Sequence, residues 1–330
     1  MLKYLISRFN QMSHIYVGSD IPTYRMMFYY LDFLLAFVFY GSSISDYFAY
    51  GFYKQRRAGR NEYITYRRYH KIQNICNPVD KHREICRNKI NFNHRFSNFL
   101  GRNWLDVSKS DFSQFEDFVN RHDIIFIKEV NGFRGIGTRK YITKDILDIN
   151  ELYNILQSDD KSHYIIEEQI TQIASLKEFH PWSVNTIRIV TVYNDKTNQV
   201  HFMNARLRMG NKRNHVDNFH FDGIGANINI QTGIIDTLGY DAYNNTYIFH
   251  PETHKQIIGF KIPYWEECKD FAARAAKSLP EIRYVGWDIV IKDGGEFILI
   301  EANDNADHDF QQLHNKGLWK EYRHLISQLK

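Results

Sequence analysis

The chain has 330 residues, a length that predicts two or three packed subdomains rather than one small core. Hydrophobic residues make up 43%, charged residues 24%, and the formal net charge is +4, so the composition is that of a globular protein without the basic bias of nucleic-acid binders. Three cysteines without a CxxC pair argue against a disulfide scaffold and a zinc site, and with no visible signal peptide they favour the cytoplasm.

Residues 1–84 are expected to form a helical N-terminal region, because they show helical spacing and no segment that alternates as a strand does. The most apolar stretch, 26–44, contains Asp32, whereas a spanning helix needs about 20 apolar residues without a central charge. The favoured interpretation is therefore a buried or amphipathic helix. The alternative is contact with the inner membrane surface, which would suit an enzyme acting on a lipid-linked substrate.

Residues 85–163 contain a short apolar run, 123–128, that predicts a strand ending in Lys128. A glycine-rich loop, a second strand and a helix around 145–157 follow. Glycine lets the backbone come close to phosphate oxygens, and the lysine adds a point charge beside them. The glycines of this predicted phosphate loop are Gly132, Gly135 and Gly137. The Walker A motif is absent, so the pattern alone also fits a plain hairpin with an exposed lysine.

Residues 164–330 are expected to form a C-terminal subdomain, which begins with an apolar strand that ends in two glutamates. A carboxylate at this strand end can accept a hydrogen bond from an adenine amino group, and the following backbone can pair with the ring. The candidate adenine-binding residues are Glu167, Glu168, Gln169 and Ile170.

Two further predicted strands, 185–194 and 201–210, carry arginines. Arg188 lies on the first, and Arg206 and Arg208 share one face of the second because side chains alternate along a strand. Positive charge aimed at a transferring phosphoryl group is a recurring means of stabilising it. Ordinary surface arginines are the alternative.

The strongest signal is a predicted hairpin at 285–304, which turns at Asp-Gly-Gly and follows a helix at 264–279. Glu301 and Asn303 are two residues apart and share a face of the second strand, and Asp288 can lie near them across the ladder. Oxygen side chains that converge in this way are the ligands that Mg²⁺ takes, with phosphate oxygens completing its coordination. The hairpin therefore predicts a magnesium site, and the alternative is three solvent-facing polar residues at the end of a sheet.

The order of these motifs along the chain resembles that of the ATP-grasp superfamily. In that superfamily a lysine before a helix, a lysine before a glycine loop and a glutamate-bearing strand precede an Asp…Glu-x-Asn element. The resemblance implies an α+β fold of the ATP-grasp type, in which two α/β subdomains grip ATP, together with the helical N-terminal region. The D-alanine–D-alanine ligases share this architecture. The residues that carry the resemblance are Lys89, Lys128, Glu167 to Ile170, Asp288, Glu301 and Asn303.

The resemblance also implies how ATP would be held. Lys89 and Lys128 would bind the α- and β-phosphates, and the loop from Gly132 to Gly137 would close over the triphosphate. Glu167 and the backbone to Ile170 would hold the adenine.

For the metal site the resemblance implies two magnesium ions, carried by Asp288, Glu301 and Asn303. Arg188 or Arg206 would stabilise the transferring phosphoryl group, with Lys128 close by. The D-alanine–D-alanine ligases have an arginine two residues before the metal aspartate, but this chain has a glycine there, so one of these two arginines would have to replace it.

Four strings narrow the resemblance to the sugar-transfer-associated ATP-grasp family, whose members tend to occur with polysaccharide biosynthesis functions such as capsule formation. These strings are HPWSVNTIRIVTV at 180–192, ARLRMG at 205–210, VDNFHFDGIGANINIQTG at 216–233 and GFKIPYWEE…VGWDIVI at 259–291. No Pro-Gly substrate loop follows Asn303, so the acceptor site stays unassigned.

The activity that the resemblance implies is a carboxylate–amine ligase that forms an acyl phosphate from ATP and joins it to an amine, releasing ADP. The expected partners are a sugar or amino acid with a carboxylate and an amine acceptor, in surface polysaccharide biosynthesis. Two alternatives stay open: kinase-like transfer to a hydroxyl, and a non-catalytic nucleotide-binding protein. A polar loop could bind either kind of acceptor through Asp217, Asn218, His220 and Asp222.

Overall fold

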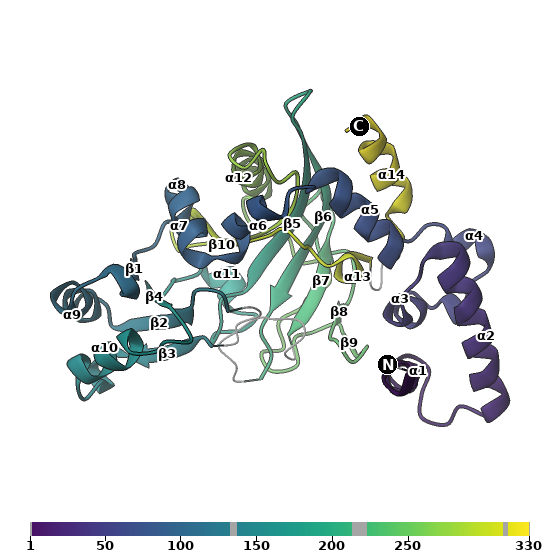
Figure 1. Cartoon of the computed structure of the whole chain (residues 1–330), viewed down its shortest axis with the longest axis horizontal. Helices are drawn as coiled ribbons and strands as arrows, with labels where there is room; N and C mark the ends of the chain where they lie inside the picture. Colours follow the sequence, from purple (N-terminus) through teal and green to yellow (C-terminus); the bar gives the residue numbers. More distant parts are fainter. Residues whose placement is uncertain (1, 133–136, 213–222, 313–315, 330) are drawn as a thin grey trace.

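The computed structural model describes residues 2–132, 137–212, 223–312 and 316–329. Figure 1 shows three parts in a row: a small sheet with its helices, a larger sheet in the middle, and the N-terminal helices at the opposite end. The small sheet has four strands and the large sheet seven.

The N-terminal helices pack around aromatic side chains. The ring of Phe9 lies 4.9 Å from that of Phe48, and both belong to one buried cluster with Tyr47. Gly41 ends α2 in the left-handed conformation, and Ser43 caps α3 through a reciprocal capping box with Asp46. The elements of this region are α1 (Leu2–Tyr16), α2 (Thr23–Tyr40), α3 (Ile44–Ala49), η1 (Phe52–Lys54) and α4 (Arg57–Arg60).

The apolar stretch around Asp32 forms a helix, α2, as expected. Asp32 accepts hydrogen bonds from both terminal nitrogens of Arg60 at 3.0 and 2.7 Å and from the Tyr47 hydroxyl at 2.8 Å. This explains how a carboxylate is tolerated in such an apolar helix, because the buried charge is paired and hydrogen-bonded. Within the described part of the chain, no helix has the length and apolar character needed to cross a membrane.

A second set of helices leads from the N-terminal region to the large sheet. Ile72 and Cys76 of α5 pack against Tyr322 of the C-terminal helix. The helices continue to Leu100, past the boundary expected at residue 84, and that boundary stays a prediction. The helices are α5 (Tyr66–Cys76), α6 (Asp80–Arg87), α7 (Lys89–Arg95), α8 (Ser97–Leu100) and, at the C-terminus, α14 (Trp319–Gln328).

The small sheet is antiparallel in the order β1-β4-β2-β3, and helices cover one of its faces. Ile125 and Ile127 of β2 belong to the apolar cluster beneath these helices. Because side chains alternate, Phe126 and Lys128 project from the opposite face. The elements are β1 (Trp104–Asp106), η2 (Val107–Lys109), α9 (Phe112–Arg121), β2 (Ile124–Glu129), β3 (Arg139–Ile142), η3 (Thr143–Asp145), α10 (Ile149–Gln157) and β4 (Tyr164–Glu168).

The large sheet has the order β11-β10-β5-β6-β7-β8-β9 and is antiparallel throughout its described pairings. The hairpin predicted at 285–304 is β10 and β11, and the predicted helix at 264–279 is α12, so both predictions are confirmed. The elements are α11 (Ala174–Lys177), β5 (Thr186–Asn194), β6 (Gln199–Met209), β7 (Ile224–Ile228), β8 (Gly239–Tyr240), β9 (Thr246–Tyr247), α12 (Trp265–Lys277), β10 (Tyr284–Ile291), β11 (Phe297–Asn303) and α13 (His308–Gln312).

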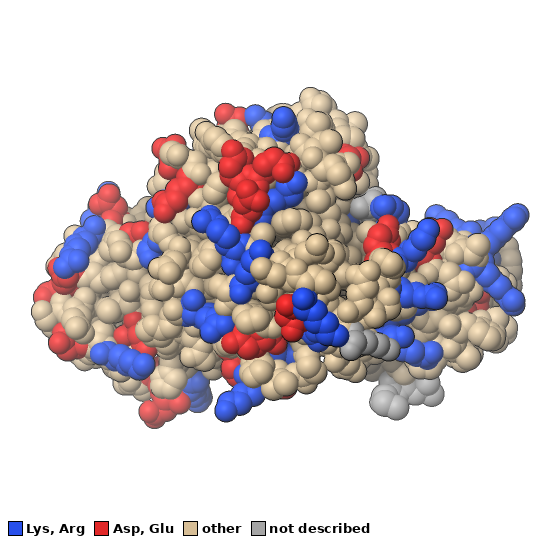
Figure 2. Space-filling view, turned by 90° about the horizontal axis from the view of Figure 1, so that it is seen from above, with Lys and Arg blue, Asp and Glu red and all other residues tan. Residues whose placement is uncertain are grey.

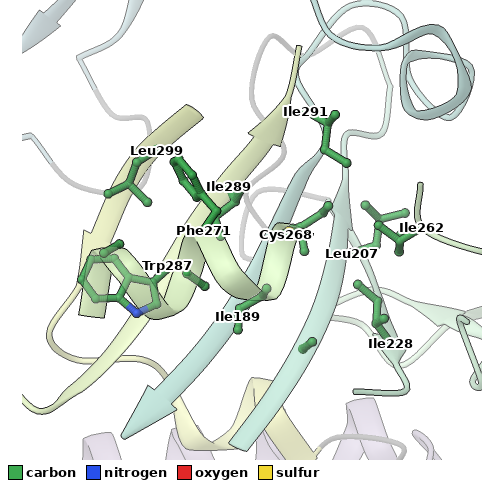
Figure 3. Packing of buried hydrophobic residues seen from close by; sticks show 14 of the residues in the cluster. Ile189, Leu207, Ile228, Ile262, Cys268, Phe271, Trp287, Ile289, Ile291 and Leu299 are labelled. Atoms are coloured by element: carbon green, nitrogen blue, oxygen red, sulfur yellow. The ribbon is translucent and has the colours of Figure 1, made fainter. Parts of the chain in front are cut away.

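The two faces of the large sheet differ in chemistry. One face buries Ile189, Trp287 and Ile289 against α12, where Cys268 and Phe271 meet them (Figure 3). The opposite face carries charged side chains in register: Asp288 pairs with Arg188 across β10 and β5, and Arg188 pairs with Arg206 across β5 and β6. The alternation of single strands thus concentrates the charges on one side of the sheet.

Candidate functional site

A cavity of about 290 Å³ is bordered by residues of both sheets. The small sheet supplies β2, β4 and the segment after β4, and the large sheet supplies β5, β6, β10 and β11. The predicted site residues that line this cavity are Lys89, Lys128, Gly132, Glu167, Glu168, Gln169, Ile170, Asp288 and Glu301. Residues far apart in the sequence therefore meet at one place, whereas Gly137, Arg188, Arg206 and Asn303 do not line it.

Asp288 is held by two arginines. Its carboxylate accepts hydrogen bonds from Nη2 of Arg188 at 2.8 Å and from Nη1 of Arg208 at 2.7 Å, and Nε of Arg188 also donates to it. Burial opposes ionisation of Asp288, but the two guanidinium charges outweigh it and hold the pKa of Asp288 below its usual range. Asp288 is therefore a carboxylate anion at neutral pH.

Glu301 lies directly opposite Asp288 in the β10–β11 ladder. Within the described residues its carboxylate has no hydrogen bond or ion pair. Burial and the neighbouring charge of Asp288 raise the pKa of Glu301, although Arg188, Arg208 and Lys89 oppose this. An acidic pair with one unpartnered member beside a cavity is costly, and a bound cation would relieve the cost.

The oxygen atoms present at this edge fit magnesium. Asn303 donates its Nδ2 to the Gly286 carbonyl at 3.4 Å, so its amide oxygen is the atom left to act as a ligand. Together with the carboxylates of Asp288 and Glu301, this makes an all-oxygen donor set, which suits a hard cation such as Mg²⁺. A cation could bind Asp288 only if the ion pairs of Asp288 with Arg188 and Arg208 lengthened or broke.

Glu167 holds Lys128 in the cavity. Its Oε2 accepts from Lys128 Nζ at 2.6 Å, and its Oε1 accepts from Arg102 at 2.9 Å. Burial opposes ionisation, but the charges of Arg102 and Lys128 hold the pKa of Glu167 far below its usual range. Both carboxylate oxygens are thus engaged by cations, which favours a role in positioning Lys128. Arg102 was not predicted, and nothing in its local sequence sets it apart.

Lys89 is joined to the start of the glycine loop. Its ammonium donates to the carbonyl of Glu129 at 2.9 Å and to that of Gly132. Burial lowers the pKa of Lys89, Glu301 opposes this, and Lys128 adds to the lowering. Gly137 has φ +78°, a left-handed backbone conformation that favours glycine, and a Cβ there would lie 2.7 Å from Glu129 Cδ. Some residues of the predicted loops lie outside the described part of the chain: Gly135, Asp217, Asn218, His220 and Asp222.

The end of β4 is tied to the segment that leads into β1. Glu168 accepts hydrogen bonds from the backbone nitrogen of Asn103 at 3.0 Å and from its side-chain nitrogen at 2.9 Å, and His122 lies 2.9 Å from the same carboxylate. The backbone nitrogen of Gln169 donates to Ile124 at 3.2 Å. Glu168 thus secures this strand end, and Gln169 and Ile170 line the cavity beyond it.

The two arginines on β6 have different surroundings. Arg206 is 0% exposed, donates to the Gln311 carbonyl at 2.7 Å, and stacks over Tyr240 and Phe310. Burial lowers the pKa of Arg206 to about 9, and it does not line the cavity. Arg208 lines the cavity and binds Asp288. The alternation along the strand predicted only that both arginines share one face, and the tertiary packing determines that Arg208 and not Arg206 lines the cavity.

Gly286 leaves room for Arg188. A Cβ at position 286 would lie 2.9 Å from the Cβ of Ala306 and 3.1 Å from the Cδ of Arg188. The Arg188 side chain therefore runs over this glycine, and the two arginines that contact Asp288 come from β5 and β6, not from β10.

The protein-family model described as sugar-transfer associated ATP-grasp matches residues 107–326 of the chain. None of the curated proteins matches the chain.

Solved structures resemble the chain over part of its length. The ATP-grasp ligase PsnB, complexed with a minimal precursor, Mg and ADP, is 16% identical with a TM-score of 0.44, covering 76% of this chain and 61% of PsnB. D-alanyl-alanine synthetase A from Vibrio cholerae O1 biovar eltor is 12% identical with a TM-score of 0.45, covering 75% and 65%. N5-carboxyaminoimidazole synthetase from Staphylococcus aureus, complexed with ADP, is 8% identical with a TM-score of 0.41, covering 68% and 45%. The chain thus spans less than two thirds of each of these proteins.

Proposed function

The chain belongs to the sugar-transfer associated ATP-grasp family, and from this premise we propose that it is a Mg-ATP-dependent ligase that joins a carboxylate to an amine. The observation that carries the proposal is the Asp288–Glu301 pair, which faces the same cavity as Lys89 and Lys128. Acidic side chains that suit a cation, beside basic ones that suit phosphates, form a site for a metal-bound polyphosphate.

In the proposed reaction a substrate carboxylate oxygen attacks the γ-phosphorus of ATP, and the bond to the bridging oxygen breaks so that ADP leaves. The amine nitrogen then attacks the carbonyl carbon of the acyl phosphate and loses a proton, and inorganic phosphate leaves to give the amide. Magnesium, held by Asp288, Glu301 and Asn303, would neutralise the charge of the phosphate oxygens.

The basic side chains have separate tasks in this proposal. Lys89 and Lys128 bind phosphate oxygens, and Glu167 orients Lys128 for this purpose. Arg188 and Arg208 form a cationic pair next to Asp288, and their positive charge would suit the transferring phosphoryl group. Arg206, packed against Tyr240, supports the sheet behind them.

The proposed substrates are an acidic sugar or an amino acid that bears the carboxylate, and an amine acceptor. The family description, sugar-transfer associated, supports a setting in surface polysaccharide biosynthesis such as capsule formation. We place the reaction in the cytoplasm, at the inner surface of the membrane.

A hydroxylamine trap tests the proposed chemistry. The protein is mixed with Mg-ATP, hydroxylamine and a panel of uronic acids, nucleotide-linked uronic acids and amino acids, and hydroxamates are sought by mass spectrometry. A hydroxamate is expected with one acid class, and it should disappear in Asp288→Asn and Lys128→Ala. Glu281→Gln, which alters a carboxylate bound to the exposed Arg95, is the matched control and should keep the activity.

A different product would overturn the ligase proposal. ADP formation with a phosphorylated hydroxyl and no hydroxamate would identify a kinase on the same fold. ATP binding without turnover of any acid, amine or hydroxyl in the panel would favour a non-catalytic nucleotide-binding protein.

A further inference from the structure

The N-terminal region exposes an apolar helix face that the packing of the chain does not use. Helix α2 buries Tyr29 and Ala36 on one side, next to the ion pair of Asp32 and Arg60. On its exposed side large apolar residues recur at helical spacing, each between 53% and 68% exposed. We call this surface the α2 apolar face, and its residues are Tyr24, Met27, Phe28, Leu31, Leu34, Leu35 and Val38.

Two neighbouring aromatic residues, Phe37 and Phe39, are exposed to the same degree at the C-terminal end of the helix. A contiguous apolar surface of this kind marks a contact site, because scattered apolar residues are common on protein surfaces but large patches are not. The α2 apolar face is thus too extensive to be ordinary surface.

Positive charge surrounds this face. Arg25 lies at the start of α2, and the Arg67 guanidinium donates to the Phe37 and Val38 carbonyls at its end. Figure 2 shows Lys and Arg side chains gathered at the end of the molecule that the N-terminal helices form. Within residues 3–79 the exposed basic residues are Lys3, Arg25, Lys54, Arg56, Arg57, Arg67 and Lys71, and the exposed acidic residues are Asp20 and Glu62.

We propose that the α2 apolar face binds the surface of an anionic lipid bilayer, with α2 lying in the plane of the interface. Apolar and aromatic side chains of such a helix enter the boundary between headgroups and acyl chains, while basic residues at its edges pair with anionic headgroups. A second copy of the chain fits less well, because it would bring the same positive charge against this one. The proposal does not depend on the ligase chemistry.

Sedimentation with lipid vesicles tests this proposal on the full chain. The protein should sediment with phosphatidylcholine vesicles that contain about one third phosphatidylglycerol, and much less with pure phosphatidylcholine. The triple variant Met27→Ser, Leu31→Ser, Leu35→Ser should lower the partition coefficient at least about tenfold, because three inserting side chains are lost. The double variant Arg56→Glu, Arg57→Glu should weaken binding to anionic vesicles by a similar factor.

The matched control alters exposed apolar residues far from α2. Leu147→Ser with Ile155→Ser changes two exposed side chains near α10 and should leave vesicle binding unchanged. Circular dichroism and ATP binding confirm that each variant is folded, since none of these residues lines the cavity.

Failure of the wild-type chain to sediment with anionic vesicles would overturn the proposal, and so would undiminished binding by the triple variant. If the wild type is instead a dimer that the triple variant converts to a monomer in analytical ultracentrifugation, without vesicle binding, a second copy covers this face. Hydroxamate formation is read separately, so failure here is distinguishable from failure of the proposed ligase activity.

Discussion

At the scale of single residues, the site combines a paired and an unpaired carboxylate. Asp288 is bound by Arg188 and Arg208, whereas Glu301, directly opposite, has no hydrogen bond or ion pair within the described residues. The raised pKa of Glu301, caused by burial and by Asp288, is the electrostatic consequence. The proposed metal-binding role of Glu301 and the stability of the ligand-free protein therefore make opposite demands on this position.

Glu301→Gln should stabilise the ligand-free protein and inactivate it. A group with a raised folded pKa favours the folded state at low pH and loses this contribution as pH rises through the folded pKa, so Glu301 favours the folded state less at pH 7 than at low pH. We expect the free energy of unfolding in urea to rise by about 1 kcal/mol at pH 7, and by less at pH 4. Activity should fall at least about 100-fold. A variant that is less stable at pH 7 would contradict this assignment.

His308 is a second group with a raised pKa, but here an ion pair with Asp46 stabilises the charged form. Its Nε2 lies 2.9 Å from Asp46, and its ring stacks on Tyr69, which joins α13 to the N-terminal helices. Burial lowers the pKa of His308, but the hydrogen bond and charge of Asp46 and the charges of Asp309 and Asp307 outweigh this and raise it.

Because this pKa is raised, the contribution of His308 to stability should be full below about pH 6.5 and lost as pH rises through the folded value. We expect His308→Gln to lower the free energy of unfolding by about 1 kcal/mol at pH 5.5 and by little at pH 9. Urea titrations at both pH values measure it, with the exposed His14→Gln as control. An equal loss at both pH values would refute the role of the charge.

At the scale of elements, alternation and turn chemistry predicted the large sheet well. The helix near 264–279 and the hairpin at 285–304 lie where the sequence places them, because their apolar spacing and Asp-Gly-Gly turn are local signals. The pairing of Glu167 with Arg102 could not be predicted, since the two residues are 65 positions apart and only the sheet brings them together. It likewise could not be predicted that Arg206 is packed against aromatic rings while Arg208 lines the cavity, because this depends on which residues pack above the sheet.

Helix α2 shows the limit of hydropathy alone. Asp32 lowers the hydropathy of the helix, yet it neutralises the nearly buried Arg60. We expect Asp32→Leu to destabilise the protein by about 3 kcal/mol, because it leaves a guanidinium unpaired in an aromatic cluster. Leu35→Ala on the exposed face should change stability by no more than about 0.5 kcal/mol. Chemical denaturation compares the two, and similar losses would show that Asp32 is not structurally important.

At the scale of the whole molecule, two sheets contribute opposite halves of one cavity. The small sheet supplies Lys128 and Glu167, and the large sheet supplies Asp288 and Glu301. A ligand that bridges both halves should stabilise the fold by mass action, by about 2.7 kcal/mol at one hundred times its dissociation constant. The stabilisation should require magnesium, because the acidic pair would otherwise repel a triphosphate.

Isothermal titration calorimetry with a non-hydrolysable ATP analogue tests the proposed site most directly. We expect one nucleotide to bind in the presence of Mg²⁺, and binding to weaken at least about tenfold with EDTA or in Glu301→Gln, while the remote Glu281→Gln binds as the wild type does. Binding that is equally tight without magnesium, or in Glu301→Gln, would contradict the assignment of Asp288 and Glu301 as the metal-holding pair.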